Sequence, residues 1–284
     1  MKYNDITIAS GKGGAGKTTI AVSLASYAAR RRCIQTTLCD CDVEEPDDSL
    51  FLDIDLQSEE VHTEYPVIDK ALCISCGSCA TICQFNAIVM VNRMPLLFHE
   101  LCHACRGCMY ACEPGAVIMG KRPYGSLEYG TTDRLTLVAG TLRVREVLSP
   151  RLIRTVKERS AGADFRIIDA PPGSSCSAVQ ALSGASYAVL VCEPTSFGFH
   201  DFRMVYEIVR EMGMPCGVVI NRYRDEHSEI VDFCTSEDIT VIATFPEDME
   251  LARHYSRGEV VSYMLSNHVE GLERIMDAVG GNDV

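Results

Sequence analysis

The apolar positions of this chain fall into short runs that alternate with amphipathic or alanine-rich stretches. Each run is short enough for a buried strand. Helical patterns span residues 18–29 and 144–159, and another begins near Ser174. Strands that alternate with helices predict a mostly parallel, doubly wound α/β sheet with helices on both faces. We interpret as strands the runs at residues 5–9, 33–39, 135–139, 165–170, 187–192, 216–221 and 240–245.

Residues 63–122 interrupt this alternation. The segment begins near Tyr65-Pro66, ends near Arg122-Pro123 and contains two similar halves, LCISCGSCATICQFNAIVM and LCHACRGCMYACEPGAVIM, offset by 29 residues. Self-similarity at a fixed offset predicts two copies of one small unit, which we expect to pack as a pseudo-symmetric pair. We therefore predict a discontinuous α/β domain of residues 1–62 and 123–284, with a small inserted domain of residues 63–122.

The composition is that of a globular protein, with 47% hydrophobic and 23% charged residues. The formal net charge of −13 disfavours a nucleic-acid partner, because phosphate backbones are held chiefly by Lys and Arg. No stretch approaches the roughly 18 apolar residues of a membrane span. The N-terminal MKYNDITIASG lacks the charged segment and apolar core of a signal peptide. We expect a cytoplasmic protein without a membrane partner.

A phosphate-binding motif lies between the first strand and the first helix. It reads GKGGAGKTT over residues 11–19, and its context of strand, glycine turn and helix is the one such a loop requires. The motif predicts ATP and Mg²⁺ as cofactors, with Lys17 at the β- and γ-phosphates, Thr18 at the metal and Thr19 at an inner phosphate. The loop backbone that would surround the phosphates comprises Gly11, Lys12, Gly13, Gly14, Ala15 and Gly16.

Lys12 adds a second lysine to this loop. GKGGAGKTT thereby resembles the deviant phosphate-binding loop of the MinD and ParA ATPases, a group that includes the nitrogenase iron protein. The resemblance implies a dimer, formed with a second copy or with a related ATPase, in which Lys12 touches the nucleotide of the other subunit. It also implies that Lys12 and Lys17 both take part in ATP hydrolysis.

Two acidic segments resemble the switches of the same ATPase group. Asp40 and Asp42 follow a predicted strand in the stretch DCDVEEPD, and Asp169 ends another strand in DAPPG. By resemblance, Asp42 orients the attacking water, Asp40 lies near the metal and Asp169 holds Mg²⁺ through water. An ordinary acidic loop is the alternative for the first segment.

The adenine base is expected near the ends of the last two predicted strands. Asn221 ends one strand, where the family reads the adenine edge with an asparagine, and residues 246–248, with Pro246 and Asp248, match the loop that closes over the base. A turn asparagine is the alternative for Asn221. The acidic tail over residues 266–284 is weakly helical and lacks the basic amphipathic helix with which MinD binds membranes.

Eight of the 15 cysteines form two runs with the same spacing, CxxCxxCxxxC. In a cytosolic chain such runs favour metal ligands over disulfides, and a third ligand two residues after a CxxC disfavours zinc. The doubled run resembles the bacterial ferredoxin with two [4Fe–4S] clusters, in which the fourth cysteine of each run binds the other cluster. The resemblance implies one cluster on Cys73, Cys76, Cys79 and Cys112, and another on Cys83, Cys102, Cys105 and Cys108.

Neither cysteine run is followed directly by proline, as the ferredoxin pattern is, since Gln84 follows Cys83 and Glu113 follows Cys112. The chain as a whole resembles a MinD-type ATPase with an inserted α+β ferredoxin domain. It is therefore expected to hydrolyse ATP and to couple an ATP-dependent change of its dimer to electron transfer through the clusters to a redox partner. The alternative is an ATPase that assembles or carries iron–sulfur or other metal clusters for a client protein.

Overall fold

The computed structural model describes residues 4–224 and 228–280. The chain divides into two compact units, a large one of residues 1–58, 128–141 and 150–284 and a small one of residues 59–127 and 142–149. The predicted domain boundaries, after residues 62 and 122, fall inside two long strands, β3 (Gln57–Ile68) and β6 (Val117–Thr132). The assignment of two domains with those limits remains a prediction.

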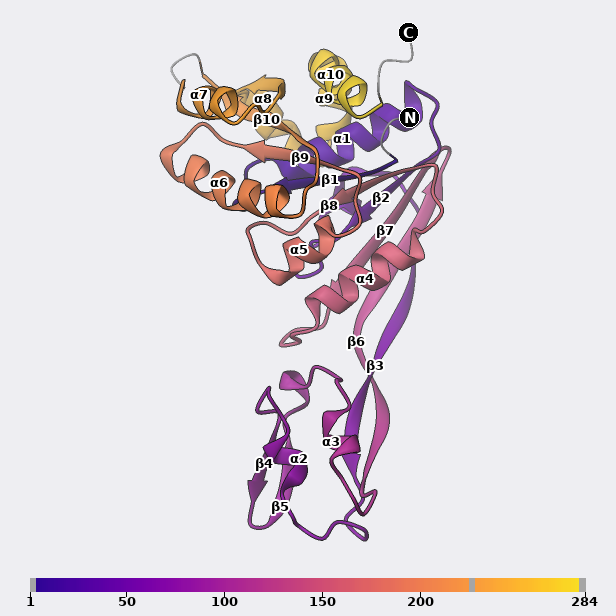
Figure 1. The fold of residues 1–284 in the computed structure, drawn as a ribbon. Coiled ribbons are helices and arrows are strands. Elements are labelled where there is room, and N and C mark those ends of the chain that lie inside the picture. The colour runs from indigo at the N-terminus through magenta and orange to yellow at the C-terminus, as the bar shows by residue number, and fades with distance from the viewer. Residues whose placement is uncertain (1–3, 225–227, 281–284) are drawn as a thin grey trace. The chain divides into compact units, whose positions relative to one another are not determined.

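One sheet, of nine strands, runs through the described residues in the order β11-β10-β9-β1-β8-β2-β7-β6-β3 (Figure 1). Every neighbouring pair from β11 to β7 is parallel, which confirms the prediction of a mostly parallel α/β sheet. Besides β3 and β6, its strands are β1 (Asp5–Ser10), β2 (Thr36–Asp40), β7 (Leu135–Leu142), β8 (Phe165–Asp169), β9 (Tyr187–Cys192), β10 (Cys216–Tyr223) and β11 (Val241–Pro246).

Helices cover both faces of the parallel part of the sheet (Figure 1). The helix α1 packs with α9 and α10 on one face, and α5 and α6 pack against β1 and β9 on the other. The helices of the large unit are α1 (Lys17–Arg30), α4 (Ser149–Arg159), α5 (Cys176–Leu182), α6 (Ser196–Glu211), α7 (Ser228–Ser236), α8 (Met249–Tyr255), α9 (Val260–Asn267) and α10 (Val269–Gly280), with the short 3₁₀ helix η1 (Asp48–Phe51) after β2.

The central strands are apolar on both faces because helices bury both. Ile6, Ile8, Leu38 and Ile167 are each fully buried, and each stabilises the fold by roughly 1.5–3 kcal/mol relative to an exposed side chain. The core continues into α1, whose small Ala and Ser positions let it lie close to the sheet. No helix within the described ranges combines the length and the apolarity that crossing a membrane requires.

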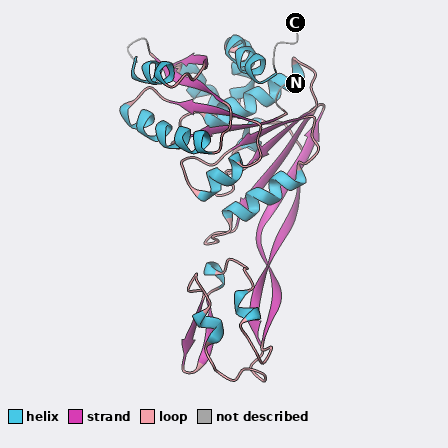
Figure 2. Cartoon of the chain, in the orientation of Figure 1, coloured by secondary structure: helices cyan, strands magenta, loops and turns pink. Residues whose placement is uncertain are grey.

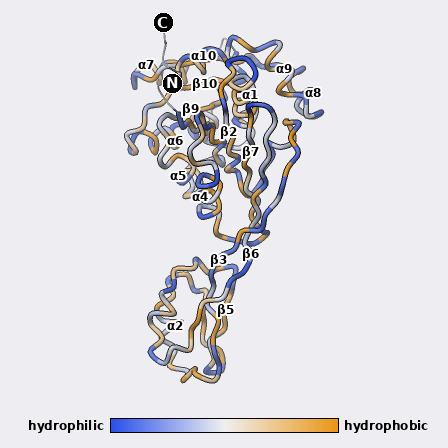
Figure 3. Tube along the Cα trace, turned by 90° about the vertical axis from the view of Figure 1, so that its right-hand side faces the viewer, coloured by the Kyte–Doolittle hydropathy of each residue, from blue (hydrophilic) through white to orange (hydrophobic). Residues whose placement is uncertain are grey.

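The small unit consists of two similar halves (Figures 1 and 2). Its elements are the short helices α2 (Ser78–Thr81) and α3 (Gly107–Tyr110), the antiparallel hairpin of β4 (Ile88–Val91) and β5 (Met94–Leu97), and the 3₁₀ helix η2 (His99–Leu101), together with parts of β3 and β6. Hydrophobic residues recur along its whole trace, as Figure 3 shows. Its buried core is small, and Cys79 and Cys108 belong to it together with Ile88 and Val117.

The sequence patterns did not predict β3 and β6. Both strands carry residues that favour turns, Pro66 in β3 and three glycines and Pro123 in β6. Two of these glycines are needed for close packing: an added Cβ would lie 2.3 Å from the Asp55 carbonyl oxygen at Gly130, and 3.1 Å from the Tyr65 ring at Gly120. Here glycine permits close approach of neighbouring segments, so it does not end the strand.

Two elements, one strand and one helix, begin later in the chain than the sequence predicted. The run at residues 33–39 becomes a strand only from Thr36, because Cys33 adopts a left-handed backbone conformation with φ 55°. The helix expected over residues 144–159 begins at Ser149, and residues 142–149 belong to the small unit. Of the predicted tail helix, residues 281–284 lie outside the described residues, while α9 and α10 account for the rest.

Candidate nucleotide site and cysteine sites

The phosphate-binding loop connects β1 to α1. Gly14 and Gly16 have φ values of 80° and 93°, which residues with a side chain rarely adopt. Gly16 precedes the first residue of α1, so the loop N–H groups and the helix N-terminus lie at one site. Gly11 is needed for another reason, since a Cβ there would lie 2.2 Å from the backbone carbon of Asp201 in α6.

Lys17 and Thr18 both bind the Asp169 carboxylate. The Lys17 Nζ lies 2.9 Å from Asp169 Oδ1, and the Thr18 hydroxyl donates a 2.8 Å hydrogen bond to Asp169 Oδ2. Asp169 is fully buried at the end of β8, and Lys17 is 6% exposed. Burial disfavours the charge on Lys17, but Asp169 outweighs burial and raises the Lys17 pKa. Three of the predicted ATP and metal residues are thus in direct contact with one another.

The two carboxylates of the first acidic segment occupy different environments. Asp40 ends β2 directly beside Asp169 in the parallel register, and it is 1% exposed. Its carboxylate accepts hydrogen bonds from the backbone N–H groups of Asp42, Asp47 and Asp48. Asp42 is only partly buried, and burial, reinforced by the negative charge of Asp169, raises its pKa to about 6 although Lys17 opposes the shift.

A cavity of about 530 Å³ adjoins the phosphate loop. Most of the predicted nucleotide residues line it, but Gly11, Ala15, Asp40 and Asp169 do not. Residues that the sequence did not single out also line it, among them Glu45, Asp47, Arg222 and Tyr255. The predicted residues in its lining are Lys12, Gly13, Gly14, Gly16, Lys17, Thr18, Thr19, Asp42, Asn221, Pro246 and Asp248.

The predicted adenine residues make contacts of their own. The Asn221 side-chain amide donates a 2.9 Å hydrogen bond to the Ala15 carbonyl, so it holds the phosphate loop. Asp248 caps α8 and accepts hydrogen bonds from the Tyr263 hydroxyl at 2.8 Å and from His268 at 3.0 Å. Both side chains therefore fix the cavity wall, and their contact with a base remains a prediction.

Lys12 forms an ion pair with Glu193 of its own chain. The Nζ–Oε2 distance is 2.5 Å, and the Lys12 side chain is 33% exposed whereas that of Glu193 is 6% exposed. Glu193 follows β9 and also pairs with Arg222, which lies near the end of β10. Sequence reasoning missed Glu193, because only the fold brings the end of β9 to the loop; an acidic residue directly after a buried apolar strand was the available signal.

The backbone of the two cysteine runs repeats along the chain. Left-handed conformations occur at Ser75 and Gly77 in the first run and at the equivalent Ala104 and Arg106 in the second. The helices α2 and α3 follow at equivalent positions and pack against each other, as expected for a pseudo-symmetric pair. Within these turns the backbone N–H of Ser78 bonds to the Cys76 thiol and that of Ala104 bonds to the Cys102 thiol. Inward N–H groups of this kind are found around phosphates and iron–sulfur clusters.

Two further cavities lie in the small unit. Four cysteines line each cavity together with apolar residues, and each set draws its fourth cysteine from the other run. No three described cysteines bring their Sγ atoms within 4.8 Å of one another, so they form no compact single-ion site. The first cavity contains Cys73, Cys76, Cys79 and Cys112, and the second contains Cys83, Cys102, Cys105 and Cys108.

The sequence profile of the CobQ/CobB/MinD/ParA nucleotide-binding domain matches residues 6–261. Two uncharacterized proteins of Methanocaldococcus jannaschii are similar in sequence. MJ0578 is 35% identical over 222 residues, which cover 76% of this chain and 77% of that protein. MJ0579 is 27% identical over 227 residues, which cover 77% of this chain and 80% of that protein.

Solved structures show the same fold. The septum site-determining protein MinD of Pyrococcus horikoshii, in complex with Mg-ADP, has a TM-score of 0.60 at 20% identity and covers 97% of this chain and 95% of its own. An ATP complex of Cyanothece McdA has a TM-score of 0.59 at 15% identity, with 100% and 98% covered. At these identities the likeness concerns the fold. The family profile, which matches most of the chain, establishes that the chain belongs to the CobQ/CobB/MinD/ParA family and carries its nucleotide-binding domain.

Proposed function

We propose that this protein hydrolyses ATP and couples the change that ATP causes in a dimer to electron transfer through two [4Fe–4S] clusters. The observation that carries the proposal is the sorting of the eight cysteines into two cavities. Each cavity combines three cysteines of one run with the last cysteine of the other. This is the exchange of fourth ligands that two-cluster ferredoxins use.

The residues of both cavities suit such a cluster. Thiolates are the ligands that iron–sulfur clusters take, and backbone N–H groups in both runs already bond to the thiols of Cys76 and Cys102. The sulfur atoms of each set are spread more widely than ligands of a single ion, as a cube of iron and sulfide needs. Cys79 and Cys108 also contribute to the small core of this unit, so bound clusters would support its fold. When bound, the clusters supply one-electron chemistry.

Each nucleotide residue has a role that follows from its present contacts. Mg²⁺ would supply charge neutralisation at the phosphates, held by Thr18 and, through water, by Asp169. Lys17 would exchange the Asp169 carboxylate for phosphate oxygens, because its side chain already lies at the loop. Asp42 lies in the cavity wall and would orient the attacking water in its ionised form.

Lys12 supports the dimer in this proposal. Lys17 serves the nucleotide of its own chain, so a second lysine in the loop gains a separate use when it reaches the phosphates of another chain. The second chain would be another copy or a related ATPase. To reach it, Lys12 would leave Glu193, with which it pairs here. The partner at the small unit would be a protein that gives or takes single electrons.

The first experiment tests the clusters. Protein purified without oxygen should contain about eight iron and eight acid-labile sulfide per chain, as two four-iron clusters require. Cys112→Ser should lower the iron and sulfide content, whereas Cys176→Ser, an exposed cysteine of α5 outside both sets, should leave it unchanged. Zinc without sulfide in the wild-type protein would refute the proposal.

The second experiment tests the coupling to ATP. The reduction potential of at least one cluster should shift when Mg²⁺ and a non-hydrolysable ATP analogue are added, because β3 starts soon after the Asp42 segment and continues into the small unit. Lys17→Ala should abolish the shift. Identical titrations with and without the analogue would refute coupling. Transfer of intact clusters to an apo-protein on ATP addition would favour the carrier function instead.

A further inference from the structure

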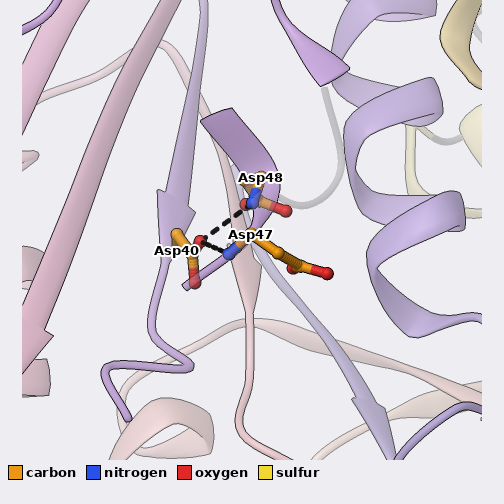
Figure 4. A group of neighbouring side chains, drawn as sticks. All are labelled: Asp40, Asp47 and Asp48. Carbon is orange, nitrogen blue, oxygen red and sulfur yellow. Dashed lines mark hydrogen bonds between the residues drawn. The ribbon is translucent and has the colours of Figure 1, made fainter. Parts of the chain in front are cut away.

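Three carboxylates converge beside the nucleotide cavity at the end of β2 (Figure 4). Asp40 is the last residue of β2, Asp47 precedes η1, and Asp48 is the first residue of η1. One carboxylate oxygen of each residue lies within 4.8 Å of the other two. Asp40 and Asp48 are buried and Asp47 is half-buried, so the group differs from the acidic clusters that are common on protein surfaces.

The Asp48 carboxylate is the unexplained member of this group. Its residue is 0% exposed, and neither of its side-chain oxygens has a hydrogen-bond partner. A buried carboxylate without a partner is strongly unfavourable, and a protonated carboxyl would still leave its O–H unpaired. The group must therefore be compensated by something besides the described residues of the chain.

The backbone holds these carboxylates together in spite of their charge. Asp40 accepts the N–H groups of Asp47 and Asp48 on one oxygen and that of Asp42 on the other. A carboxylate offers about four acceptor positions, so this leaves Asp40 with at least one. The Tyr255 hydroxyl donates a 3.1 Å hydrogen bond to Asp47 Oδ2 and holds that side chain as well.

Positive charge from the chain is already committed nearby. Lys17 acts on Asp40 and Asp48 through space, but its Nζ is bonded to Asp169 at 2.9 Å. A water molecule could satisfy the Asp48 oxygens, but it would not hold three neighbouring carboxyl groups together in their ionised form. A cation offsets the charges and satisfies the oxygens together, and three carboxylates are the hard ligand set of Mg²⁺, Mn²⁺ or Ca²⁺.

We infer that Asp40, Asp47 and Asp48 bind a divalent cation of this hard class, at a site separate from the Mg²⁺ of the nucleotide. The separation follows from the contacts. Thr18 and Asp169, which the nucleotide metal would use, bond to each other, whereas Asp48 bonds to neither and does not line the nucleotide cavity. Asp47 lines that cavity and Asp40 ends β2 beside Asp169, so the two cation sites would be neighbours. Asp40, which is predicted to lie near the nucleotide metal, would thus lie between the two cations.

The cation would fix the segment that connects β2 to η1. Residues 41–46 lie between the ligands Asp40 and Asp47, and Asp42 and Glu45 of this interval line the nucleotide cavity, as Asp47 does. A cation that clamps both ends of this segment would set the position of Asp42 before ATP binds. This consequence rests on the proposed ATPase role of Asp42, whereas the binding of the cation does not.

The probe is Mn²⁺ alone, added without nucleotide to full-length protein that has been treated with a chelator. Bound Mn²⁺ is measured by the loss of the EPR signal of the free ion. Wild-type protein should bind about one Mn²⁺ per chain at this site. Loss of an outer-shell partner typically lowers metal affinity roughly 10- to 100-fold, so Asp48→Asn, which changes a direct ligand, should lower Mn²⁺ affinity at least as much. The matched control is Asp53→Asn, which removes an exposed carboxylate of the same segment and should bind Mn²⁺ as wild type does.

Two further variants keep the test decisive. Asp47→Asn alters a half-buried side chain, so it should fold and bind Mn²⁺ more weakly even if Asp48→Asn does not fold. Thr18→Ala should keep the Mn²⁺ site, because Thr18 belongs to the nucleotide metal. Any of three results would overturn the inference. The wild-type protein could bind no Mn²⁺, Asp48→Asn could fold and bind Mn²⁺ as Asp53→Asn does, or Thr18→Ala could lose Mn²⁺ binding. Failure of ATP hydrolysis or dimerisation would leave it standing.

Discussion

Replacing Glu193 with glutamine should strengthen the ATP-dependent dimer. Lys12 is paired with Glu193 at 2.5 Å in the single chain, and the proposed dimer requires Lys12 to leave this partner for phosphates of the other chain. The ion pair thus stabilises the monomer alone. Glu193→Gln removes the negative charge with almost no change in volume, and the amide oxygen can still accept a hydrogen bond from Arg222.

The expected magnitude follows from the exposure of the pair. Lys12 is 33% exposed, so solvent screens the interaction and about 1 kcal/mol is a fair upper value. A symmetric dimer breaks two such pairs, which gives about 2 kcal/mol, or roughly a 30-fold lower dimer dissociation constant. The neutral hydrogen bond that the introduced amide can still make with Lys12 reduces this, so we expect an effect between about 5- and 30-fold.

Sedimentation velocity without oxygen, with Mg²⁺ and a non-hydrolysable ATP analogue, measures the dimer dissociation constant directly. Glu273→Gln is the matched control, because Glu273 is also paired with an arginine but lies on α10 with its side chain 53% exposed. Lys12→Ala should prevent dimerisation while leaving ATP affinity nearly unchanged. A Glu193→Gln dimer that is as weak as the wild type, or weaker, would show that Glu193 does not compete for Lys12.

Three more measurements test other parts of the site. Burial raises the Asp42 pKa to about 6. The folded nucleotide-free chain therefore binds the Asp42 proton more tightly than the unfolded chain does, so the free energy of unfolding should rise as the pH falls from 7 to 5. Thermal melts of Asp42→Asn over the same pH range should lack that contribution. Melting temperatures of wild type and Asp42→Asn that change equally with pH would contradict the prediction. Cys112→Ser should alter the spectrum of the cluster on the first run, and Cys83→Ser that of the second, so the reverse outcome would exclude the exchange of fourth ligands. Glu146→Gln, which frees the charge of Arg122 near Cys102, should raise the potential of the second cluster in a redox titration, and an unchanged potential would contradict this.

The sequence predicted those parts of the site whose chemistry is local. The phosphate loop and the cysteine runs are contiguous motifs, and their spacing alone limits what they can bind. Asp169 was predictable because it ends an apolar strand, and parallel strands end at the same sheet edge. The offset of the two cysteine runs also predicted two equivalent halves, which the left-handed residues of the small unit repeat.

Other features depend on contacts between distant segments. Glu193 reaches Lys12 only because β9 lies beside β1 in the sheet, and Asn221 reaches the loop carbonyl from β10. The strands β3 and β6 were missed because their glycines and prolines indicate turns until the neighbouring segments are known. Asp48 had no pattern of its own, since nothing in DCDVEEPDD, residues 40–48, distinguishes a buried carboxylate from an exposed one.

Both phosphate-binding lysines are held by carboxylates of their own chain, but the two pairs differ in what happens to the carboxylate once the lysine leaves. In the proposed mechanism Asp169, which accepts a hydrogen bond from Thr18, would turn to the nucleotide metal, so ATP and Mg²⁺ together would compensate the loss of Lys17 within one subunit. Glu193 keeps Arg222 as a partner, so Lys12 can depart without leaving a buried charge unpaired. Lys12 gains a stronger partner only from phosphates that face it across a dimer. On this proposal the first exchange follows nucleotide binding, whereas the second requires another chain, so the ATP-loaded dimer, rather than the ATP-loaded monomer, would be the state competent for hydrolysis.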